Sequence, residues 1–348
     1  MMTPNVQVAL ALGSGAARGW AHIGVIQALQ EMGVHVHLVA GTSIGSLVGA
    51  AFAAGRLSDL ESWVRGMDRW EVFNLLDFGF NHGGLIHGEK VFSRAREVIG
   101  SIDIEDMPLV YGAVATDLYS GREIWLRKGD VYEAARASCS MPGLLAPTAL
   151  NGRWLVDGAL VNPVPVSLCR ALGSDFVIAV NLNSQLNTSA IEARSKYVAP
   201  KEPTHDVTAK DQPQVDVYGH NTPPSETTVD PQKTDEGDQS EPGFFHNFLS
   251  HSQQYWDAMM EKMNGNLHKA PGMLGVMSGS IDIMQERITK ARLAGDPPDI
   301  LIQPKLGQIS LMEFERGNEA IAVGYETTIR MKDFILAELE LYKERRGS

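Results

Sequence analysis

The pentapeptide GTSIG at residues 41–45 matches the pattern G-x-S-x-G, in which a serine stands between two glycines. The pattern indicates a nucleophile when a strand precedes it and a helix follows it, and here apolar residues 36–40 come before it and small residues continue to about Ala54. A serine on so sharp a turn adopts a strained backbone, and side chains at Gly41 and Gly45 would collide with it. The pentapeptide is also compatible with an ordinary Gly-Ser turn, so the prediction that Ser43 is a nucleophile depends on the rest of the chain.

A serine hydroxyl needs a general base within hydrogen-bond reach. Asp157 follows the apolar residues 154–156 and precedes Gly158, which permits close approach of backbone or substrate. An Asp-Gly pair also occurs in ordinary hairpin turns. A triad in the order Ser, acid, His would combine Asp157 with one of three later histidines, His246, His251 or His268. These lie in an aromatic- and methionine-rich region with helical spacing and do not follow a clear final strand, which argues against a triad.

A third candidate is the small-residue loop GSGAARG at 13–19, which follows an apolar stretch and opens a helical pattern. Converging backbone N–H groups in such a loop bind anions. A P-loop would need Lys and Ser or Thr after Gly19, where Trp20 stands, and a dinucleotide fingerprint would need glycine at Arg18. The remaining interpretation is an oxyanion hole beside Ser43, with amide donors near Gly15 and Ala16. His22 is expected to help pack this loop.

Taken together, these three segments resemble the patatin-like phospholipase family, and within it the bacterial RssA-type branch. The resemblance covers about residues 6–183 and 270–345. It is strengthened by the runs ARGWAHIGV at 17–25, ASCSMPG at 137–143, VNPVP at 161–165 and AGDPPDILI at 294–302.

The resemblance implies a three-layer α/β/α fold and a cofactor-free lipid acyl hydrolase with a Ser–Asp dyad and no histidine. Residue by residue it makes Ser43 the nucleophile, Asp157 the base and Arg18 the residue that orients the loop. It assigns the oxyanion hole to Gly13, Ser14, Gly15 and Ala16, and the motif glycines to Gly41, Gly45 and Gly158. Ser14 and Ala16 interrupt the family's run of glycines, and we expect Ala16 to have a negative φ.

The elements that must position these residues alternate between strand and helix, which is typical of a mostly parallel α/β sheet. Predicted strands are 6–12, 36–40, 109–116, 123–126, 154–156, 176–181 and 299–303. Predicted helices are 20–32, a small-residue helix that follows the 41–45 turn and ends at about Ala54, and then 58–67, 89–99, 273–293 and 314–345.

Three parts of the chain differ in composition. Residues 6–183 form the predicted catalytic core, and residues 243–348 a helical part that packs on it. Residues 184–242 contain seven of the 17 prolines, no Phe or Trp, and five basic against eleven acidic residues. We predict that they are disordered, and the sequence leaves any protein partner of this segment unknown. The aromatic and Met-rich residues from 244 to 284 suit either an acyl-chain groove or buried packing.

Composition excludes some classes of function. A net charge of −12 and a pI near 5.3 argue against nucleic-acid binding and against electrostatic adhesion to anionic membranes. Two cysteines, no leader pattern and no long apolar run predict a cytoplasmic protein whose contact with the inner membrane is peripheral, transient and apolar. The sequence favours hydrolysis of phospholipid or lysophospholipid esters. Acyl transfer and a non-catalytic scaffold role are the alternatives.

Overall fold

The chain is described by a computed structural model at residues 6–75, 84–86, 88–184 and 273–347. Its central feature is an eight-stranded sheet in the order β10-β9-β1-β2-β4-β8-β7, with β5 paired to β4 off this path. The strands are β1 (Val8–Leu12), β2 (Leu38–Thr42), β4 (Val110–Asp117), β5 (Glu123–Leu126), β7 (Thr148–Leu150), β8 (Arg153–Asp157), β9 (Phe176–Val180) and β10 (Ile300–Ile302). Two further short strands, β3 (Gly84–Ile86) and β6 (Gly143–Leu145), pair with each other.

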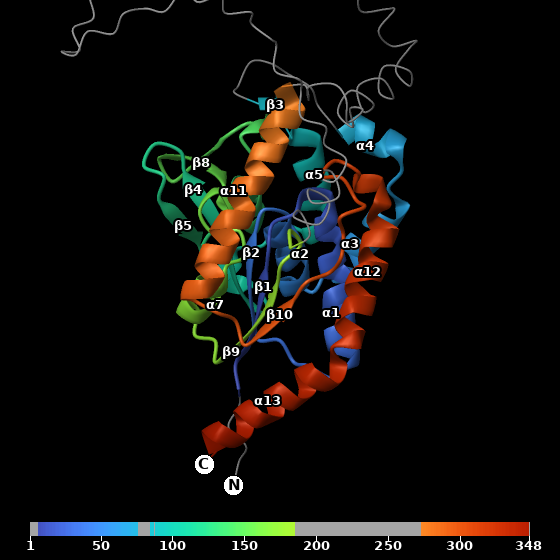
Figure 1. The fold of residues 1–348 in the computed structure, drawn as a ribbon. Helices are drawn as coiled ribbons and strands as arrows, with labels where there is room; N and C mark the ends of the chain where they lie inside the picture. Colours follow the sequence, from blue (N-terminus) through green and yellow to red (C-terminus); the bar gives the residue numbers. More distant parts are fainter. Residues whose placement is uncertain (1–5, 76–83, 87, 185–272, 348) are drawn as a thin grey trace, which may run out of the picture. The chain divides into compact units, whose positions relative to one another are not determined.

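The middle of this sheet is parallel and buried on both faces. Every residue of β1, β2 and β9 is buried, as expected for continuous apolar strands covered by helices. Helices α1 (Ala21–Glu31), α2 (Ile44–Ala53), α3 (Leu57–Gly66) and α12 (Gly317–Arg330) lie on one side, and α7 (Val166–Ala171) and α11 (Met273–Gly295) on the other (Figure 1). The predicted three-layer α/β/α fold with a mostly parallel sheet is therefore confirmed.

The sheet becomes antiparallel beyond β4. β4 pairs antiparallel with β5 and with β8, and β8 with β7. Further helices are α4 (Arg69–Leu75), α5 (Glu89–Ile99) and α6 (Val131–Cys139), and a short 3-10 turn, η1 (Ala16–Trp20), leads from the glycine loop into α1. The predicted helix 89–99 and strand 123–126 match α5 and β5, whereas α4, α6 and α7 were not predicted from the sequence.

The predicted single helix over 314–345 is wrong. A 3-10 turn at Phe314–Arg316 leads into α12, which ends at Arg330, and α13 (Lys332–Gly347) starts after Met331. The break lets the two helices cover different surfaces. α12 packs along α1 at the two glycines Gly24 and Gly324, whereas α13 places Tyr342 edge-on against Phe176 at the start of β9, 5.5 Å between ring centroids.

The segment predicted to be disordered, from 185 onward to 242, and the aromatic cluster at 244–256 fall outside the described residues. Among the helices that are described, none combines the length and the apolar character needed to cross a bilayer.

Candidate active site

Strand β4 aligns the predicted nucleophile with the predicted base. β2 runs parallel to it with Thr42 opposite Val114, and β8 runs antiparallel to it with Asp157 opposite Ala115. Since β5 pairs with β4 along 113–116, β2 and β8 share the other side of β4 and meet end to end there. Ser43, one residue beyond β2, therefore meets the last residue of β8. The Ser43 Oγ donates a hydrogen bond to Asp157 Oδ2 at 2.5 Å, with both residues at most 5% exposed.

The turn that carries Ser43 is strained. Ser43 has φ 56° and ψ −130°, in the left-handed half of backbone space that non-glycine residues rarely adopt. A Cβ on Gly41 would lie 2.4 Å from the Gly45 carbonyl oxygen, and a Cβ on Gly45 would lie 2.2 Å from that of Leu12. Both contacts are shorter than atoms allow, so only glycine fits on either side of the serine. Gly158, after the aspartate, is equally close to the carbonyl oxygen of Val114, at 2.1 Å.

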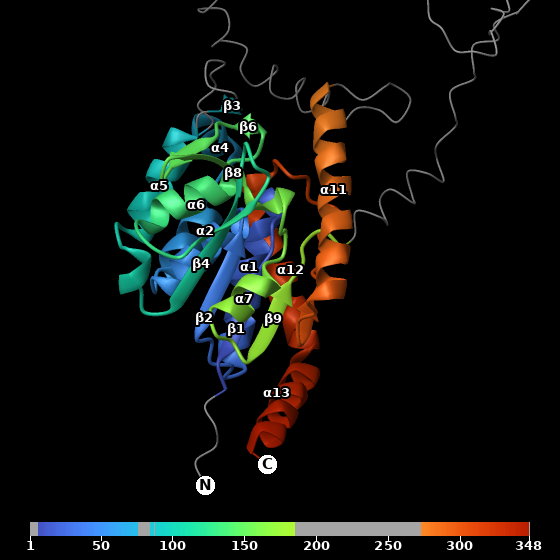
Figure 2. The same ribbon diagram turned by 90° about the vertical axis from the view of Figure 1, so that its left-hand side faces the viewer.

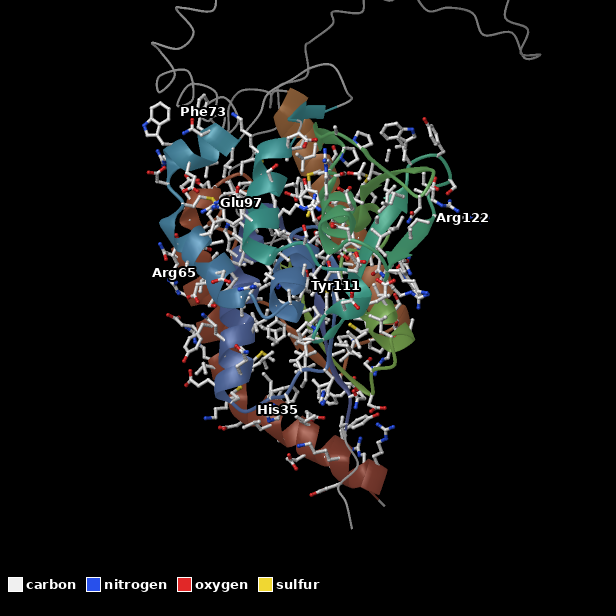
Figure 3. The ribbon with its side chains drawn as sticks, turned by 180° about the vertical axis from the view of Figure 1, so that it is seen from behind. His35, Arg65, Phe73, Glu97, Tyr111 and Arg122 are labelled. Carbon is white, nitrogen blue, oxygen red and sulfur yellow. The ribbon has the colours of Figure 1, made fainter. Side chains whose placement is uncertain are left out.

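Two buried side chains support the turn. The Ser43 N–H donates to Ser138 Oγ at 2.9 Å, and the Ser138 hydroxyl in turn donates to the Val114 carbonyl at 2.6 Å. Tyr111, in the middle of the fold seen from behind (Figure 3), donates through its hydroxyl to the Ser46 carbonyl in α2 at 2.8 Å. Ser138 lies in one of the segments that carry the family resemblance, but its spacing from Ser43 gave no signal of this contact.

Burial sets the basicity of Asp157. It raises the pKa of the carboxyl to about 7, against the opposing effect of hydrogen bonds from the Ser43 hydroxyl and the Ala159 amide. The Ala159 N–H donates to Oδ1 at 2.8 Å, and Thr116 Oγ1 donates to the Asp157 carbonyl at 2.9 Å. Within the described residues no cation forms an ion pair with this carboxylate. A carboxyl with a pKa near 7 can accept a proton from Ser43 at neutral pH.

The hydrogen bonds of the glycine loop contradict part of the predicted oxyanion hole. The amides of Gly13 and Ser14 donate to the carbonyls of Val180 and Pro163, at 3.1 and 2.9 Å, so they are not free to hold an oxyanion. Gly15 and Ala16 remain as the candidates. The expectation of a negative φ at Ala16 is wrong, because φ is 48° where the chain reverses from the loop into η1. Alanine tolerates this conformation at a cost of about 1 kcal/mol.

Arg18 and His22 hold the loop from within the protein. The Arg18 Nε donates to the Ile309 carbonyl at 2.8 Å, and its backbone N–H donates to the Gly15 carbonyl at 3.1 Å. His22 Nε2 lies 2.8 Å from the Gly13 carbonyl oxygen, which can only accept, so Nε2 donates. Burial lowers the pKa of the ring to about 4, so the ring is neutral at pH 7. His22 therefore supports the loop, as its position in the sequence indicated.

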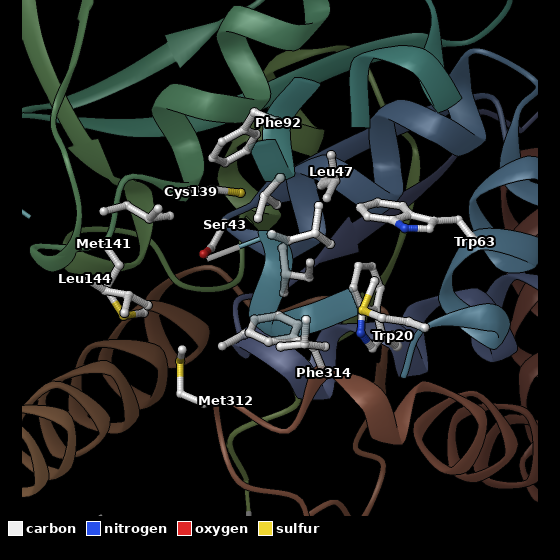
Figure 4. Close-up of a pocket in the computed structure, with 17 residues that line it drawn as sticks. Trp20, Ser43, Leu47, Trp63, Phe92, Cys139, Met141, Leu144, Met312 and Phe314 are labelled. Carbon is white, nitrogen blue, oxygen red and sulfur yellow. The ribbon is translucent and has the colours of Figure 1, made fainter. Parts of the chain in front are cut away.

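An apolar pocket opens beside Ser43 (Figure 4). Its cavity volume is about 120 Å³. Apart from the Ser43 hydroxyl and the Cys139 thiol, its lining is apolar: Ala16, Trp20, Ile44, Leu47, Trp63, Met67, Val72, Leu75, Val91, Phe92, Met141, Leu144, Leu145, Met312 and Phe314. Trp63 and Phe314 both contact the ring of Trp20 edge-on. A hydrocarbon chain fits the chemistry of such a pocket.

Two predictions about other groups remain untested. The triad candidates His246, His251 and His268 lie outside the described residues. In the part of the chain that is described, no three His, Cys, Asp or Glu side chains are grouped as metal ligands would be, and the prediction that no cofactor is needed stays a prediction.

Comparison with known proteins identifies some relatives that match over most of their own length and others that match over a small part of it. An uncharacterized NTE family protein of Mycobacterium tuberculosis is 33% identical over 344 residues, which is 91% of this chain and 89% of that protein. Patatin-like phospholipase domain-containing protein 6 of Homo sapiens is 35% identical over 195 residues, 54% of this chain but 14% of that protein. Neuropathy target esterase sws of Drosophila melanogaster is 31% identical over 188 residues, 52% of this chain and 13% of that protein.

A solved structure, that of VipD from Legionella pneumophila, aligns with 95% of this chain and 67% of its own at 13% identity and a TM-score of 0.44. The family model described as patatin-like phospholipase matches residues 10–170, the part that holds the glycine loop, the serine turn and Asp157. Together with the match to NTE family proteins over 91% of this chain, this shows that the chain belongs to the patatin-like phospholipase family.

Proposed function

We propose that this protein is a serine acyl hydrolase that cleaves lipid esters through a Ser43–Asp157 dyad and an acyl-enzyme. The observation that carries the proposal is the 2.5 Å hydrogen bond from Ser43 Oγ to a buried carboxylate at the wall of an apolar pocket. Membership of the patatin-like phospholipase family supports hydrolysis of lipid esters at the level of the family.

In the first half of the reaction Asp157 removes the proton of the Ser43 hydroxyl as Oγ attacks the ester carbonyl carbon. The negative charge that develops on the carbonyl oxygen is held by the amides of Gly15 and Ala16, an effect worth about 3–4 kcal/mol per donor. When the C–O bond to the leaving group breaks, Asp157 returns the proton to the departing alcohol. Ser43 is left as an acyl ester.

In the second half water replaces the alcohol. Asp157, again ionised, takes a proton from the water as its oxygen attacks the acyl carbon, and then returns that proton to Ser43 Oγ when the acyl bond breaks. The products are a free fatty acid and the regenerated enzyme. An acceptor alcohol in the place of water would give acyl transfer by the same steps.

The pocket supports a long-chain acyl group as the part of the substrate that is bound. None of its 17 lining residues carries a charge, so a charged head group gains nothing by entering it. The acyl chain would therefore lie in the pocket with the head group at its mouth. This is the arrangement expected for a phospholipid or lysophospholipid.

The test is labelling with a fluorophosphonate probe and mass analysis of the products from a phospholipid and lysophospholipid panel. Ser43→Ala should abolish both labelling and fatty-acid release, and Ser62→Ala, an exposed serine of α3, should leave both unchanged. Labelling that persists in Ser43→Ala would overturn the proposal. Acyl products formed on an added alcohol would indicate transfer, and wild-type protein that neither labels nor turns over would favour the scaffold function.

A further inference from the structure

Ser14, in the glycine loop, is held by two side chains that are far from it in sequence. The amide nitrogen of Asn183 lies 3.3 Å from the Ser14 carbonyl oxygen and 3.4 Å from its Oγ. The Ser14 hydroxyl donates to Gln285 Oε1 at 3.2 Å, and the Asn183 amide donates to the same oxygen at 3.2 Å. All three residues are at most 4% exposed.

This contact matters because of the geometry of the peptide bond. In a trans peptide the carbonyl oxygen and the following N–H point in opposite directions, and the described chain contains no cis peptide. The Asn183 amide on the Ser14 carbonyl therefore directs the Gly15 N–H away from Asn183 and α11. In the same way the Arg18 N–H on the Gly15 carbonyl, at 3.1 Å, fixes the direction of the Ala16 N–H.

We propose that Asn183 and Gln285 are positioning residues for the oxyanion hole: Asn183 orients the Gly15 amide through the Ser14 carbonyl, and Gln285, on α11, holds Asn183 and Ser14 in place. The proposal rests on the proposed function, since it assigns the Gly15 amide to the oxyanion. Neither residue touches the substrate.

Asn183 and Gln285 link the oxyanion hole to the position of α11. Asn183 follows β9 by three residues and Gln285 lies on α11, so the loop at Ser14 is held by two described segments that are 102 residues apart in sequence. α11 lies beside α7 in both ribbon views (Figures 1 and 2) and is fastened there by Arg292, which donates to the Val161 carbonyl at 3.0 Å and forms an ion pair with Glu123 at 2.7 Å. The docking of α11 is thereby linked to the geometry of the hole.

The decisive variant is Asn183→Asp, which keeps the shape of the side chain but replaces the N–H donors with an oxygen that repels the Ser14 carbonyl. On a soluble p-nitrophenyl ester we expect kcat to fall about 10-fold, part of the 10²–10³ that losing an oxyanion donor costs, with KM unchanged because the acyl pocket is intact. The rate of phosphonate labelling should fall by the same factor, since the adduct places an oxygen in the hole. Gln285→Met should lower both rates less, about 3-fold.

The matched control is Thr289→Val, a change of similar volume at a buried position one turn further along α11. Its hydroxyl has no hydrogen-bond partner among the described residues, so kcat should stay at the wild-type value. Circular dichroism and melting temperature establish that each variant is folded, and Gln285→Met carries the test if Asn183→Asp does not fold. Wild-type kcat and labelling in a folded Asn183→Asp or, failing that, a folded Gln285→Met overturn the positioning role. Equal changes in kcat and KM with normal labelling overturn it as well. Turnover that survives Ser43→Ala instead overturns the proposed function.

Discussion

Asp157 gains its basicity from its surroundings and not from a partner. An aspartate in water has a pKa near 4, too low to remove a serine proton efficiently at neutral pH. At the end of β8 the carboxyl is 1% exposed, and burial raises its pKa to about 7 while the Ser43 hydroxyl and the Ala159 amide orient its two oxygens. A histidine is therefore not required to explain how the serine is activated.

The first prediction concerns the pH dependence of the reaction. Because Asp157 acts as a base only when ionised, kcat/KM on a soluble ester should rise with pH through about 7 and level off above it. Asp157→Asn should lower kcat by about 10²–10⁴-fold, the usual contribution of a general base. The measurement is a pH–rate profile from pH 5 to 9, and a flat profile for wild type would contradict the assigned role.

The second prediction concerns Ser138, the buried hydroxyl between Ser43 and Val114. Ser138→Ala leaves the Ser43 N–H and the Val114 carbonyl without this partner, which should lower the free energy of unfolding by about 1–3 kcal/mol. It should also slow phosphonate labelling, because the strained turn loses the contact that fixes it. Urea unfolding checks the first effect. The exposed Ser62→Ala is its control and should change the stability by less than about 0.5 kcal/mol.

At the scale of elements, the sequence pattern predicted those parts of the site whose residues are adjacent in the chain. The strand, the serine turn and the helix of residues 38–53 could be predicted because the chemistry, the glycines and the small-residue helix are adjacent in sequence. The meeting of β2 and β8 along one side of β4 could not, since register between distant strands leaves no trace in any one segment. For the same reason the sequence could not show that the amides of Gly13 and Ser14 donate hydrogen bonds to the carbonyls of Val180 and Pro163.

The boundary between α12 and α13 shows the same limit in the helical part. Residues 314–345 keep an apolar face in helical spacing, so periodicity alone predicts one helix. The break at Met331 reflects tertiary structure: α12 follows α1, and α13 turns to cover the start of β9. Packing against two surfaces at different angles overrides a uniform local preference.

The third prediction concerns the crossing of α1 and α12. A Cβ on Gly24 would lie 1.9 Å from the Ile321 carbonyl oxygen, and one on Gly324 would lie 2.1 Å from that of Ala21. Gly24→Ala should therefore force the helices apart and destabilise the fold by about 1–3 kcal/mol. The control is Gly279→Ala in α11, where a Cβ meets nothing within 4 Å and the higher helix propensity of alanine should raise stability by about 0.5–1 kcal/mol. Thermal melts of the two variants should shift in opposite directions, and equal shifts would contradict this account of the crossing.

At the scale of the whole molecule, two buried groups at the site make the free energy of unfolding depend on pH in opposite directions. Burial raises the pKa of Asp157 to about 7 and lowers that of His22 to about 4. Between these values the folded protein keeps a proton on Asp157 that the unfolded chain releases, so rising pH lowers stability through this group. The unfolded chain also binds a proton on His22 that the folded protein excludes below about pH 6.5, so rising pH increases stability through the histidine. From about pH 4 to 6.5 the two dependences oppose each other.

The fourth prediction is that Asp157→Asn separates the pH dependence of stability due to Asp157 from the one due to His22. Below about pH 4 the carboxyl is protonated in both states of the wild type, so variant and wild type should differ little through this group. As pH rises, the variant should become progressively more stable than wild type, by up to about 1.4 kcal/mol per pH unit, until the difference levels off above pH 7. Urea unfolding of both proteins from pH 4.5 to 8 gives the difference directly, and contributions from every other titrating group cancel in it. A difference that does not change with pH would mean that Asp157 titrates alike in the folded and unfolded chain, and the tuning of the base by burial would then have to be abandoned.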